Sequence, residues 1–188
     1  MKRDFRPEIL SVLSTVKRNN MDKLINFLET SDFFTAPAST KYHLAYEGGL
    51  AEHSWNVFAI FSDKLKTYSL NFGKDSIAIC GLLHDICKTN FYTRGKKNVK
   101  EDGKWIEKEV WMVEDSLPFG HGEKSVYLLQ KYIELSDEEA LTIRWHMGFT
   151  EPKDAWMQMR VATDMYPVVM ALNIADLEAA FLVESRGE

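Results

Sequence analysis

The dipeptide His84-Asp85 is the feature that most constrains the fold, because it directly follows the apolar run at residues 77–83. A helix built from this run would carry a carboxylate and an imidazole against the protein core. An isolated buried charge is strongly destabilising unless it is paired, hydrogen-bonded or bound to a cation. The sequence therefore predicts a compensating partner at this position, and a metal ion is the first candidate.

Asp176 presents the same problem in a second apolar segment, residues 167–182. On a helix, the apolar residues of this segment form one stripe, and Asp176 lies beside it, four residues after Leu172. Imidazole and carboxylate ligands together suit Mn, Fe, Co, Ni or Zn, and we also consider Mg. We expect one or two divalent ions. The five histidines available to such a site are His43, His53, His84, His121 and His146.

Length and charge limit the classes of protein that the chain can represent. A chain of 188 residues fits a single domain spanning 1–188. The formal net charge of −5 disfavours a dedicated DNA-binding module, whose affinity depends on Lys and Arg neutralising phosphates. Basic residues do gather at positions 94–100, where a solvated loop is the ordinary interpretation. A small phosphorylated ligand or a short single strand of nucleic acid stays possible there.

The cysteines and the apolar segments indicate a cytoplasmic protein. Cys80 and Cys87 are seven residues apart on one expected helix, hence about 10 Å apart and beyond the reach of a disulfide. No stretch approaches the roughly 20 apolar residues of a membrane span, and the first residues lack the apolar region of a signal peptide. We therefore expect no membrane association.

Hydrophobic periodicity predicts a mainly α-helical protein with a small β-hairpin insert at residues 98–113. Residues 7–30 read as two short helices or one bent helix, within an N-terminal helical extension at 1–40. Asp102-Gly103 is a hairpin turn signal between two β-type segments. Ser136 and Glu139 form a capping-box pattern, and residues 150–166 read as irregular or weakly helical. The remaining helices are expected at 50–68, 74–88, 123–134, 137–146 and 167–182.

The polar residues on these helices occur in the order H, HD, H, H, D. The residues are His53, His84-Asp85, His121, His146 and Asp176. The strings around them are GGLAEH at 48–53, LLHDICK at 82–88, GHG at 120–122 and AD at 175–176. In this pattern the chain resembles the HD superfamily of metal-dependent phosphohydrolases. The chain is similar in these local strings to small uncharacterised bacterial and phage HD hydrolases and to the HD part of bacterial 3′-to-5′ exoribonucleases.

The resemblance implies an HD-type helical bundle and a definite set of metal ligands. A first ion would take His53, His84, Asp85 and Asp176, and a second ion would take Asp85, His121 and His146. A bound ion would lower the pKa of a coordinated water towards about 7 and so activate it as a nucleophile. Asp85 can bridge two ions through its two oxygens. The predicted metal ligands are therefore His53, His84, Asp85, His121, His146 and Asp176.

Lys88 lies three residues after Asp85 and four after His84, on the same face of the expected helix. Its ammonium group could neutralise a substrate phosphate, so Asp85 and Lys88 are the predicted catalytic residues. The expected substrate is a phosphomonoester or phosphodiester of a nucleotide or another small phosphorylated metabolite. For His43 a packing role, and for Arg144 a surface ion pair, are the alternatives to substrate binding. The candidate substrate contacts are His43, Lys88, Arg94, Lys96, Lys97 and Arg144.

Two other functions compete with this interpretation. The protein could be an exonuclease on single-stranded RNA or DNA ends, with the basic residues and the hairpin residues Trp105 and Trp111 forming the binding track. It could also be a non-catalytic HD module that senses a ligand. The hairpin is expected to cover the metal cleft as a lid, presenting Arg94, Lys96 or Lys97 to the substrate. The alternative is that it packs elsewhere or against a second subunit in a homodimer.

Overall fold

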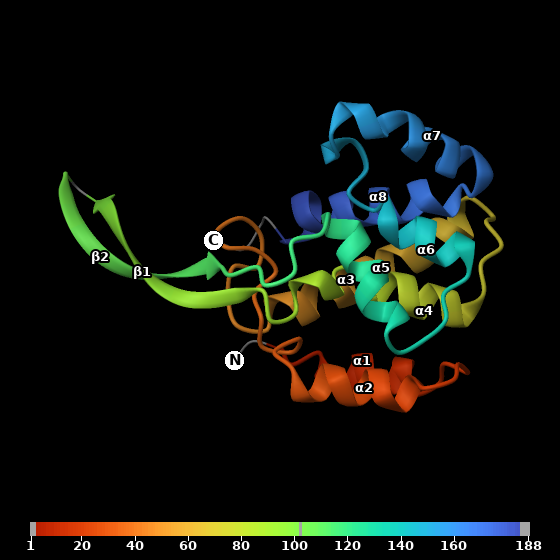
Figure 1. Ribbon diagram of the computed structural model, residues 1–188, viewed down its shortest axis with the longest axis horizontal. Coiled ribbons are helices and arrows are strands. Elements are labelled where there is room, and N and C mark those ends of the chain that lie inside the picture. Colours follow the sequence, from red (N-terminus) through yellow and green to blue (C-terminus); the bar gives the residue numbers. More distant parts are fainter. Residues whose placement is uncertain (1–2, 102, 185–188) are drawn as a thin grey trace.

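Helix α3 (Gly49–Thr67) forms the centre of the helical body and packs against α4 (Lys74–Leu83) and α8 (Val168–Glu178). The computed structural model describes residues 3–101 and 103–184 (Figure 1). The apolar residues of these three helices repeat at helical spacing, and one face of each helix is buried as a result. The main contributors to the core are Leu50, Val57, Phe61 and Leu65 of α3, Ile79, Leu82 and Leu83 of α4, and Leu172 and Ala175 of α8.

The N-terminal extension consists of two separate helices, α1 (Arg6–Leu13) and α2 (Met21–Thr30). They are distinct because Asn20 adopts a left-handed backbone conformation, with φ of 61°. Both helices lie along one side of the body (Figure 1). Ile9, Leu13, Leu24 and Leu28 are completely buried in the same core as α3 and α4. The extension is therefore an integral layer of the fold.

Helices α5 (His121–Gln130) and α6 (Asp137–Arg144) pack against each other beside α4. The predicted capping box at the start of α6 is present. Gly122 is required in α5, because a Cβ atom there would collide with the backbone carbonyl of Arg144. This close approach brings the start of α5 to the end of α6, and with it His121 towards His146.

Residues 150–166 are predicted to be irregular or weakly helical, and of these alternatives the structure has a helix, α7 (Trp156–Met165), which is regular rather than weak. Short 3₁₀ turns, η2 (Gly148–Thr150) and η3 (Lys153–Ala155), precede it. Met159 and Ala162 of α7 are buried against Trp145 and Val169. The helical pattern is hidden in the sequence because three apolar residues of α7 are exposed rather than buried, namely Met157, Val161 and Met165.

The prediction that one helix continues to Lys88 is wrong. Helix α4 ends at Leu83, His84 is its C-cap, and Asp85 has φ and ψ of −102° and 18°. A 3₁₀ turn, η1 (Ile86–Lys88), follows. Adjacent residues of a continuous helix point about 100° apart. Because the helix ends here, the side chains of His84 and Asp85 can point towards the same place.

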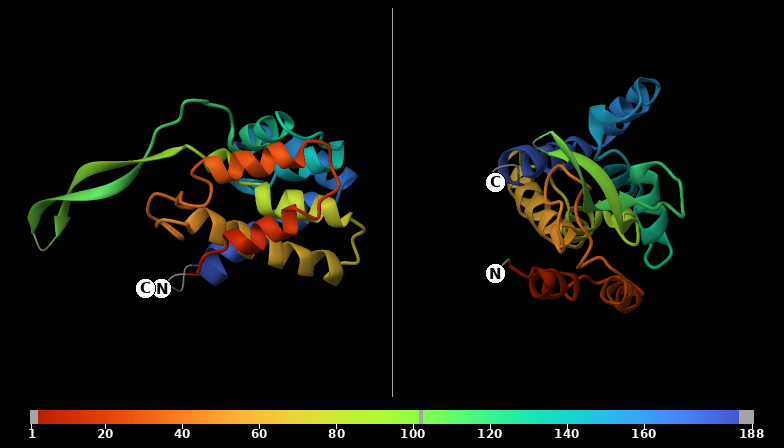
Figure 2. Two further views of the ribbon diagram at one scale, coloured as in Figure 1. Left: turned by 90° about the horizontal axis from the view of Figure 1, so that it is seen from below. Right: turned by 90° about the vertical axis from the view of Figure 1, so that its left-hand side faces the viewer.

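The hairpin consists of β1 (Tyr92–Glu101) and β2 (Lys104–Val113), so its first strand begins earlier than the predicted residue 98. The strands pair antiparallel from Tyr92 opposite Val113 to Glu101 opposite Lys104. The hairpin projects away from the helical body (Figures 1 and 2). The positions predicted as a solvated basic loop therefore lie on β1. The homodimer stays a prediction.

Within the described residues, no single helix is long and apolar enough to cross a membrane. The segments 153–165 and 168–183 meet that requirement only when taken together, and they are bent by 114° at their junction.

An ion pair between Arg18 and Glu139 ties the N-terminal layer to the start of α6. The guanidinium contacts both carboxylate oxygens of Glu139, at 2.5 and 3.1 Å, and the Glu139 side chain is buried. Burial by itself raises the pKa of Glu139, but hydrogen bonds from Arg18, and then from Ser76 and Ser136, outweigh it. The pKa of Glu139 is consequently lowered from its ordinary value of 4.5.

Replacing Glu139 with Gln should lower the free energy of unfolding at neutral pH by about 1–3 kcal/mol, the usual contribution of a hydrogen bond to a charged group. Gln retains both bonds of the capping box, so the loss measures the charge. Because the folded-state pKa is lowered, this stabilisation is complete above pH 4.5 and disappears as the pH falls further. Urea unfolding should show the two proteins converging in acid. Asp137→Asn, at an exposed position of the same helix, is the control, and a pH-independent difference would contradict the prediction.

Candidate metal centre

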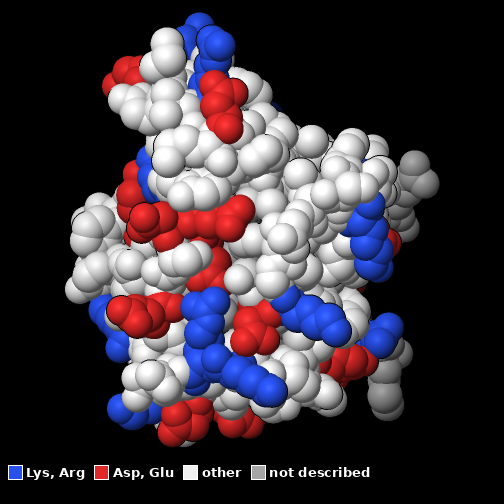
Figure 3. Space-filling model, turned by 90° about the vertical axis from the view of Figure 1, so that its right-hand side faces the viewer, with Lys and Arg blue, Asp and Glu red and all other residues white. Residues whose placement is uncertain are grey.

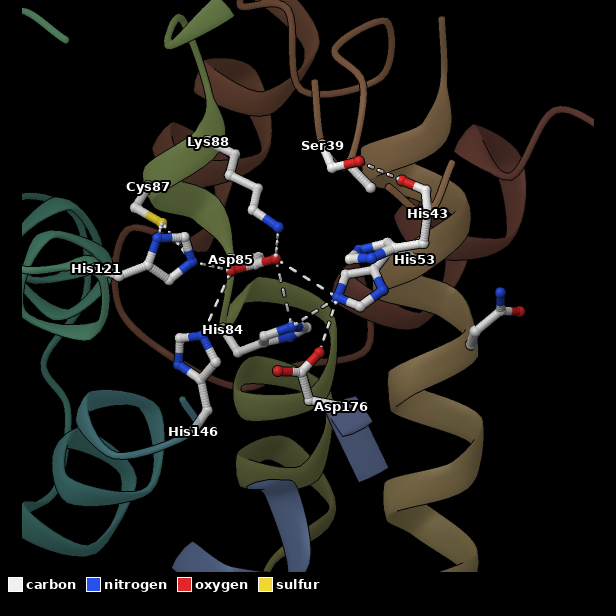
Figure 4. Close-up of polar contacts among 12 residues, drawn as sticks. Ser39, His43, His53, His84, Asp85, Cys87, Lys88, His121, His146 and Asp176 are labelled. Atoms are coloured by element: carbon white, nitrogen blue, oxygen red, sulfur yellow. Dashed lines mark hydrogen bonds and ion pairs between the residues drawn. The ribbon is translucent and has the colours of Figure 1, made fainter. Parts of the chain in front are cut away.

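The six side chains predicted as metal ligands converge on one point of the helical body (Figure 4). They come from α3, the end of α4, the start of α5, the turn after α6, and α8. In that order they are His53, His84 with Asp85, His121, His146 and Asp176. Three of the imidazoles are completely buried, those of His53, His84 and His146.

The two carboxylate oxygens of Asp85 divide the donors into two groups. Oδ1 lies 2.6 Å from Nε2 of His121 and 3.4 Å from Nε2 of His146. Oδ2 lies 3.5 Å from Nε2 of His53 and 3.8 Å from Nε2 of His84. A carboxylate in this position can offer one oxygen to each of two ions.

Asp176 completes the group around Oδ2 of Asp85. Its Oδ1 lies 3.1 Å from Nε2 of His53. It is part of a cluster with His53 and His84 whose ligand atoms all lie within 4.8 Å of one another. The group around Oδ2 follows the first ligand set that the family resemblance implies. On the other side, His146 clusters with His84 and Asp85, and His121 clusters with Asp85 and Cys87.

Hydrogen bonds to the outer nitrogens determine the tautomer of three histidines. His84 and His146 each donate from Nδ1 to the backbone carbonyl three residues earlier, at 3.0 and 2.6 Å. His53 donates from Nδ1 to the carboxylate of Glu184, whose oxygens are both 3.1 Å away. A neutral imidazole that donates through Nδ1 has a lone pair on Nε2. All three Nε2 atoms point into the centre (Figure 4).

This arrangement fits a divalent cation. Nε2 of His53 and Nε2 of His84 face each other at 3.3 Å, so one of them must carry a proton when no ion is bound. Nε2 of His146 is buried, and Oδ1 of Asp85 lies 3.4 Å from it. A cation bound between these nitrogens would replace such protons, and imidazole with carboxylate is a donor set for transition metals.

Burial and neighbouring charges set the protonation states of these groups. Burial lowers the pKa of His53, but hydrogen bonds to Asp176 and Glu184 outweigh it and raise that pKa to about 10, and Asp85 likewise raises the pKa of His146. A bound cation would replace a proton on each of these imidazoles.

Burial lowers the pKa of His84 to about 3, so this imidazole is neutral. Burial alone would raise the pKa of Asp85, but Lys88, then His121 and His84, lower it well below its ordinary value. The carboxylate is therefore ionised.

Lys88 is placed by the 3₁₀ turn rather than by a helix face, and its Nζ lies 2.5 Å from Oδ2 of Asp85. Burial opposes its charge, but the Asp85 carboxylate outweighs burial and raises the pKa of Lys88 above its ordinary value of 10.5. The ammonium group is thus charged and lies beside the centre.

The centre opens into a cavity of about 1330 Å³. His43 lines this cavity, with its ring 4.9 Å from that of His53 between centroids. Lys88, Asp85, His121 and Asp176 also line it. The structure therefore brings two of the six predicted substrate contacts, His43 and Lys88, to the cavity.

The three predicted contacts on the hairpin do not line the cavity. Arg94 lies over the ring of Trp111, with its Cζ atom 3.8 Å from the centroid. Lys96 forms an ion pair with Glu107 at 2.7 Å, and Lys97 is exposed on the strand. In this structure only the base of the hairpin, Tyr92 and Val113, borders the cavity, and the lid stays a prediction.

Arg144 is also outside the cavity lining. It forms ion pairs with Glu123 and Glu151, which is the alternative that the sequence left open for it. Cys80 and Cys87 are both free and buried, as predicted. The Sγ atom of Cys87 lies 3.4 Å from Nε2 of His121.

Sequence analysis missed Glu184, the buried carboxylate that contacts His53. It follows a π-helical segment, η4 (Ala179–Val183), which changes the helical register after α8. Asn56, three residues after His53 on α3, donates to Oε1 of Glu184 at 3.0 Å. The spacing of Asn56 from His53 is the only signal that could have indicated this contact.

Comparison with known proteins agrees with the geometry. The family model of the HD domain matches residues 50–180, and the chain therefore belongs to the HD-domain family. This confirms the resemblance to the HD superfamily of metal-dependent phosphohydrolases.

One curated relative also matches part of the chain, the dihydroneopterin 2′,3′-cyclic phosphate phosphodiesterase of Methanocaldococcus jannaschii. It is 43% identical over 72 residues, which span 36% of this chain and 27% of the relative. The matched region is thus about a quarter of the relative's length. No solved structure matches the chain.

Asp85→Ala should remove most of the bound divalent metal, because Asp85 contributes an oxygen to both groups of donors. Elemental analysis of the purified and the metal-reconstituted protein measures this directly. A chelator should also lower the melting temperature of the parent, since metal binding is coupled to folding. Asp164→Ala is the matched control, because Asp164 is exposed and pairs only with Arg160 at 3.7 Å among its described ion pairs. Unchanged metal content in Asp85→Ala would refute the centre.

The double variant His121→Ala, His146→Ala tests for a second ion. These histidines contact Oδ1 of Asp85, whereas His53 and Asp176 lie on the side of Oδ2, so their loss should reduce two bound ions to one without abolishing binding. Titration with Mn²⁺ or Co²⁺ under anaerobic conditions gives the stoichiometry. A variant that binds as many ions as the parent would exclude the binuclear site.

Proposed function

We propose that this protein hydrolyses a phosphoester bond of a small substrate, using divalent ions held by the two groups of donors around Asp85. The observation that carries the proposal is the orientation of three Nε2 atoms and two carboxylates towards one point beside a large cavity. Family membership supports the same reaction class.

The residues of the chain have distinct roles in this proposal. Asp85 holds both halves of the centre together through its two oxygens. Lys88 directs a charged ammonium group at the same carboxylate and borders the cavity, so it can bind a phosphate oxygen of the substrate. A bound divalent ion would supply an activated water at neutral pH and would neutralise charge on the phosphoryl group.

The cavity favours a substrate with one phosphate and a flat or apolar body. Lys88 is the only lysine or arginine among its described lining residues, which gives little compensation for a polyphosphate. Tyr42, Tyr46 and Tyr92 contribute aromatic surface. Aromatic side chains of this kind bind heteroaromatic rings by stacking. We infer a small phosphodiester that carries a heteroaromatic group, such as a nucleotide, and the name of the archaeal relative supports a cyclic phosphate.

The exonuclease alternative has less support. Tracking a single strand requires a basic groove with aromatic platforms. Trp111 is covered by Arg94, and the basic hairpin residues lie outside the cavity lining. On the face of the body turned away from the hairpin, basic and acidic side chains lie next to one another (Figure 3). The non-catalytic alternative is disfavoured because all six ligand positions are filled and converge.

Metal-loaded protein should turn over 2′,3′-cyclic mononucleotides faster than nucleoside triphosphates or single-stranded oligonucleotides. Lys88→Met should reduce kcat/KM by about 10²-fold, the usual effect of removing one donor that stabilises transition-state charge. Its metal content should stay unchanged, because its Nζ is not a ligand. Lys131→Met, at an exposed position on the other side of α5, is the control. Preferential turnover of oligonucleotides, or full activity of Lys88→Met, would overturn the proposal.

A further inference from the structure

The imidazole of His53 lies between two carboxylates that belong to one helical segment. Asp176 of α8 is 3.1 Å from its Nε2, and Glu184 is 3.1 Å from its Nδ1. Glu184 is only 8% exposed although it is close to the end of the described chain. A carboxylate buried at this position needs a specific partner, and His53 is that partner.

The π-helical segment explains how both carboxylates reach the same ring. Each residue of an α-helix turns the chain by about 100°, so eight residues would place Glu184 about 80° around the axis from Asp176. In a π-turn the hydrogen bonds span five residues, and each residue turns the chain by less. The segment η4 therefore rotates Glu184 back towards the face of Asp176. Single π-turns occur frequently at functional sites.

Glu184 is itself held in place by α3. Asn56 donates to its Oε1 at 3.0 Å, and Nε2 of His43 lies 3.9 Å from its Oε2. Asn56 and His53 are one helical turn apart, so they contact the carboxylate together. The result is a chain of contacts from Asn56 through Glu184 to His53 and from there into the centre.

We propose that Glu184 is a positioning residue that orients His53 as a metal ligand and increases its basicity, through the hydrogen bond to Nδ1. A carboxylate on the outer nitrogen of a ligating histidine selects the tautomer and strengthens the bond to the ion. Glu184 lies beyond residues 50–180, which the family model matches, so the HD motif does not include it. The inference rests on the metal centre of the proposed function and is independent of the substrate.

Glu184→Ala should weaken metal binding by about 10- to 100-fold, the usual effect of removing such a partner. Glu184→Gln keeps the size of the side chain and an oxygen acceptor but lacks the charge, so it should lose less. Asn56→Ala should change the affinity in the same direction by a smaller factor, because it loosens Glu184 without touching His53. Competition of Co²⁺ between the protein and a chromogenic chelator measures these affinities.

A second readout separates positioning from a structural role and needs no substrate. In protein labelled with ¹⁵N-histidine, the Nδ1–H proton of His53 should give a downfield imidazole resonance that Glu184→Ala removes. Glu178→Gln is the matched control: Glu178 is on α8, pairs with Lys64 and does not contact His53. Its metal affinity and His53 resonance should match those of the parent.

The proposal is overturned if Glu184→Ala folds and binds Co²⁺ as tightly as the parent, or if it retains the His53 resonance. If Glu184→Ala fails to fold, Glu184→Gln decides the question, and an affinity equal to that of the parent refutes the role of the charge. Loss of metal affinity in a protein that hydrolyses none of the tested phosphoesters would support Glu184 while contradicting the proposed substrate.

Discussion

The buried carboxylate of Asp85 is the constraint on which the rest of the structure depends. It is an ionised group in the interior, and its stability requires donors and charges on both of its oxygens. Lys88 meets Oδ2, and His121 meets Oδ1. Histidines from four parts of the chain are brought to this one group, so the packing of α3, α4, α5, α6 and α8 is directed towards it.

Regular helices position His53 and Asp176, but local features at three other places bring the remaining groups to the centre. The end of α4 at Leu83 turns His84 and Asp85 towards the same point. The missing side chain of Gly122 allows α5 to approach the end of α6. The π-turn of η4 directs Glu184 to His53. Each of these features costs local helical hydrogen bonding or packing and is offset by the contacts that the ligands make.

The position of the centre determines what can react there. The donors lie in the body, while the cavity that reaches them is bordered by Tyr92 and Val113 at the base of the hairpin and by aromatic side chains from the loop before α3. The hairpin itself extends away from the helical body (Figure 2). In the function proposed above, selection among phosphoesters would depend on the size and aromatic character of the cavity more than on a basic surface.

The sequence by itself determined which residues form the candidate metal centre and most of the helices, because both depend on local signals. Polar residues on apolar helical faces identified Asp85 and Asp176, and the capping box at Ser136 and Glu139 predicted the start of α6. Asp102-Gly103 predicted the hairpin turn from the preference of Gly for a positive φ.

Only the tertiary structure decided features in which one segment changes the conformation or exposure of another. The regular helix α7 was hidden because packing buries Met159 and Ala162 while leaving other apolar residues exposed. The direction of the hairpin follows from its attachment to the body, which no strand pattern encodes. Glu184 could not be found from periodicity, because the π-turn after α8 changes the helical register of the residues that follow it. This turn is stabilised by contacts with α3, such as the hydrogen bond from Asn56 to Glu184, which the sequence pattern does not show.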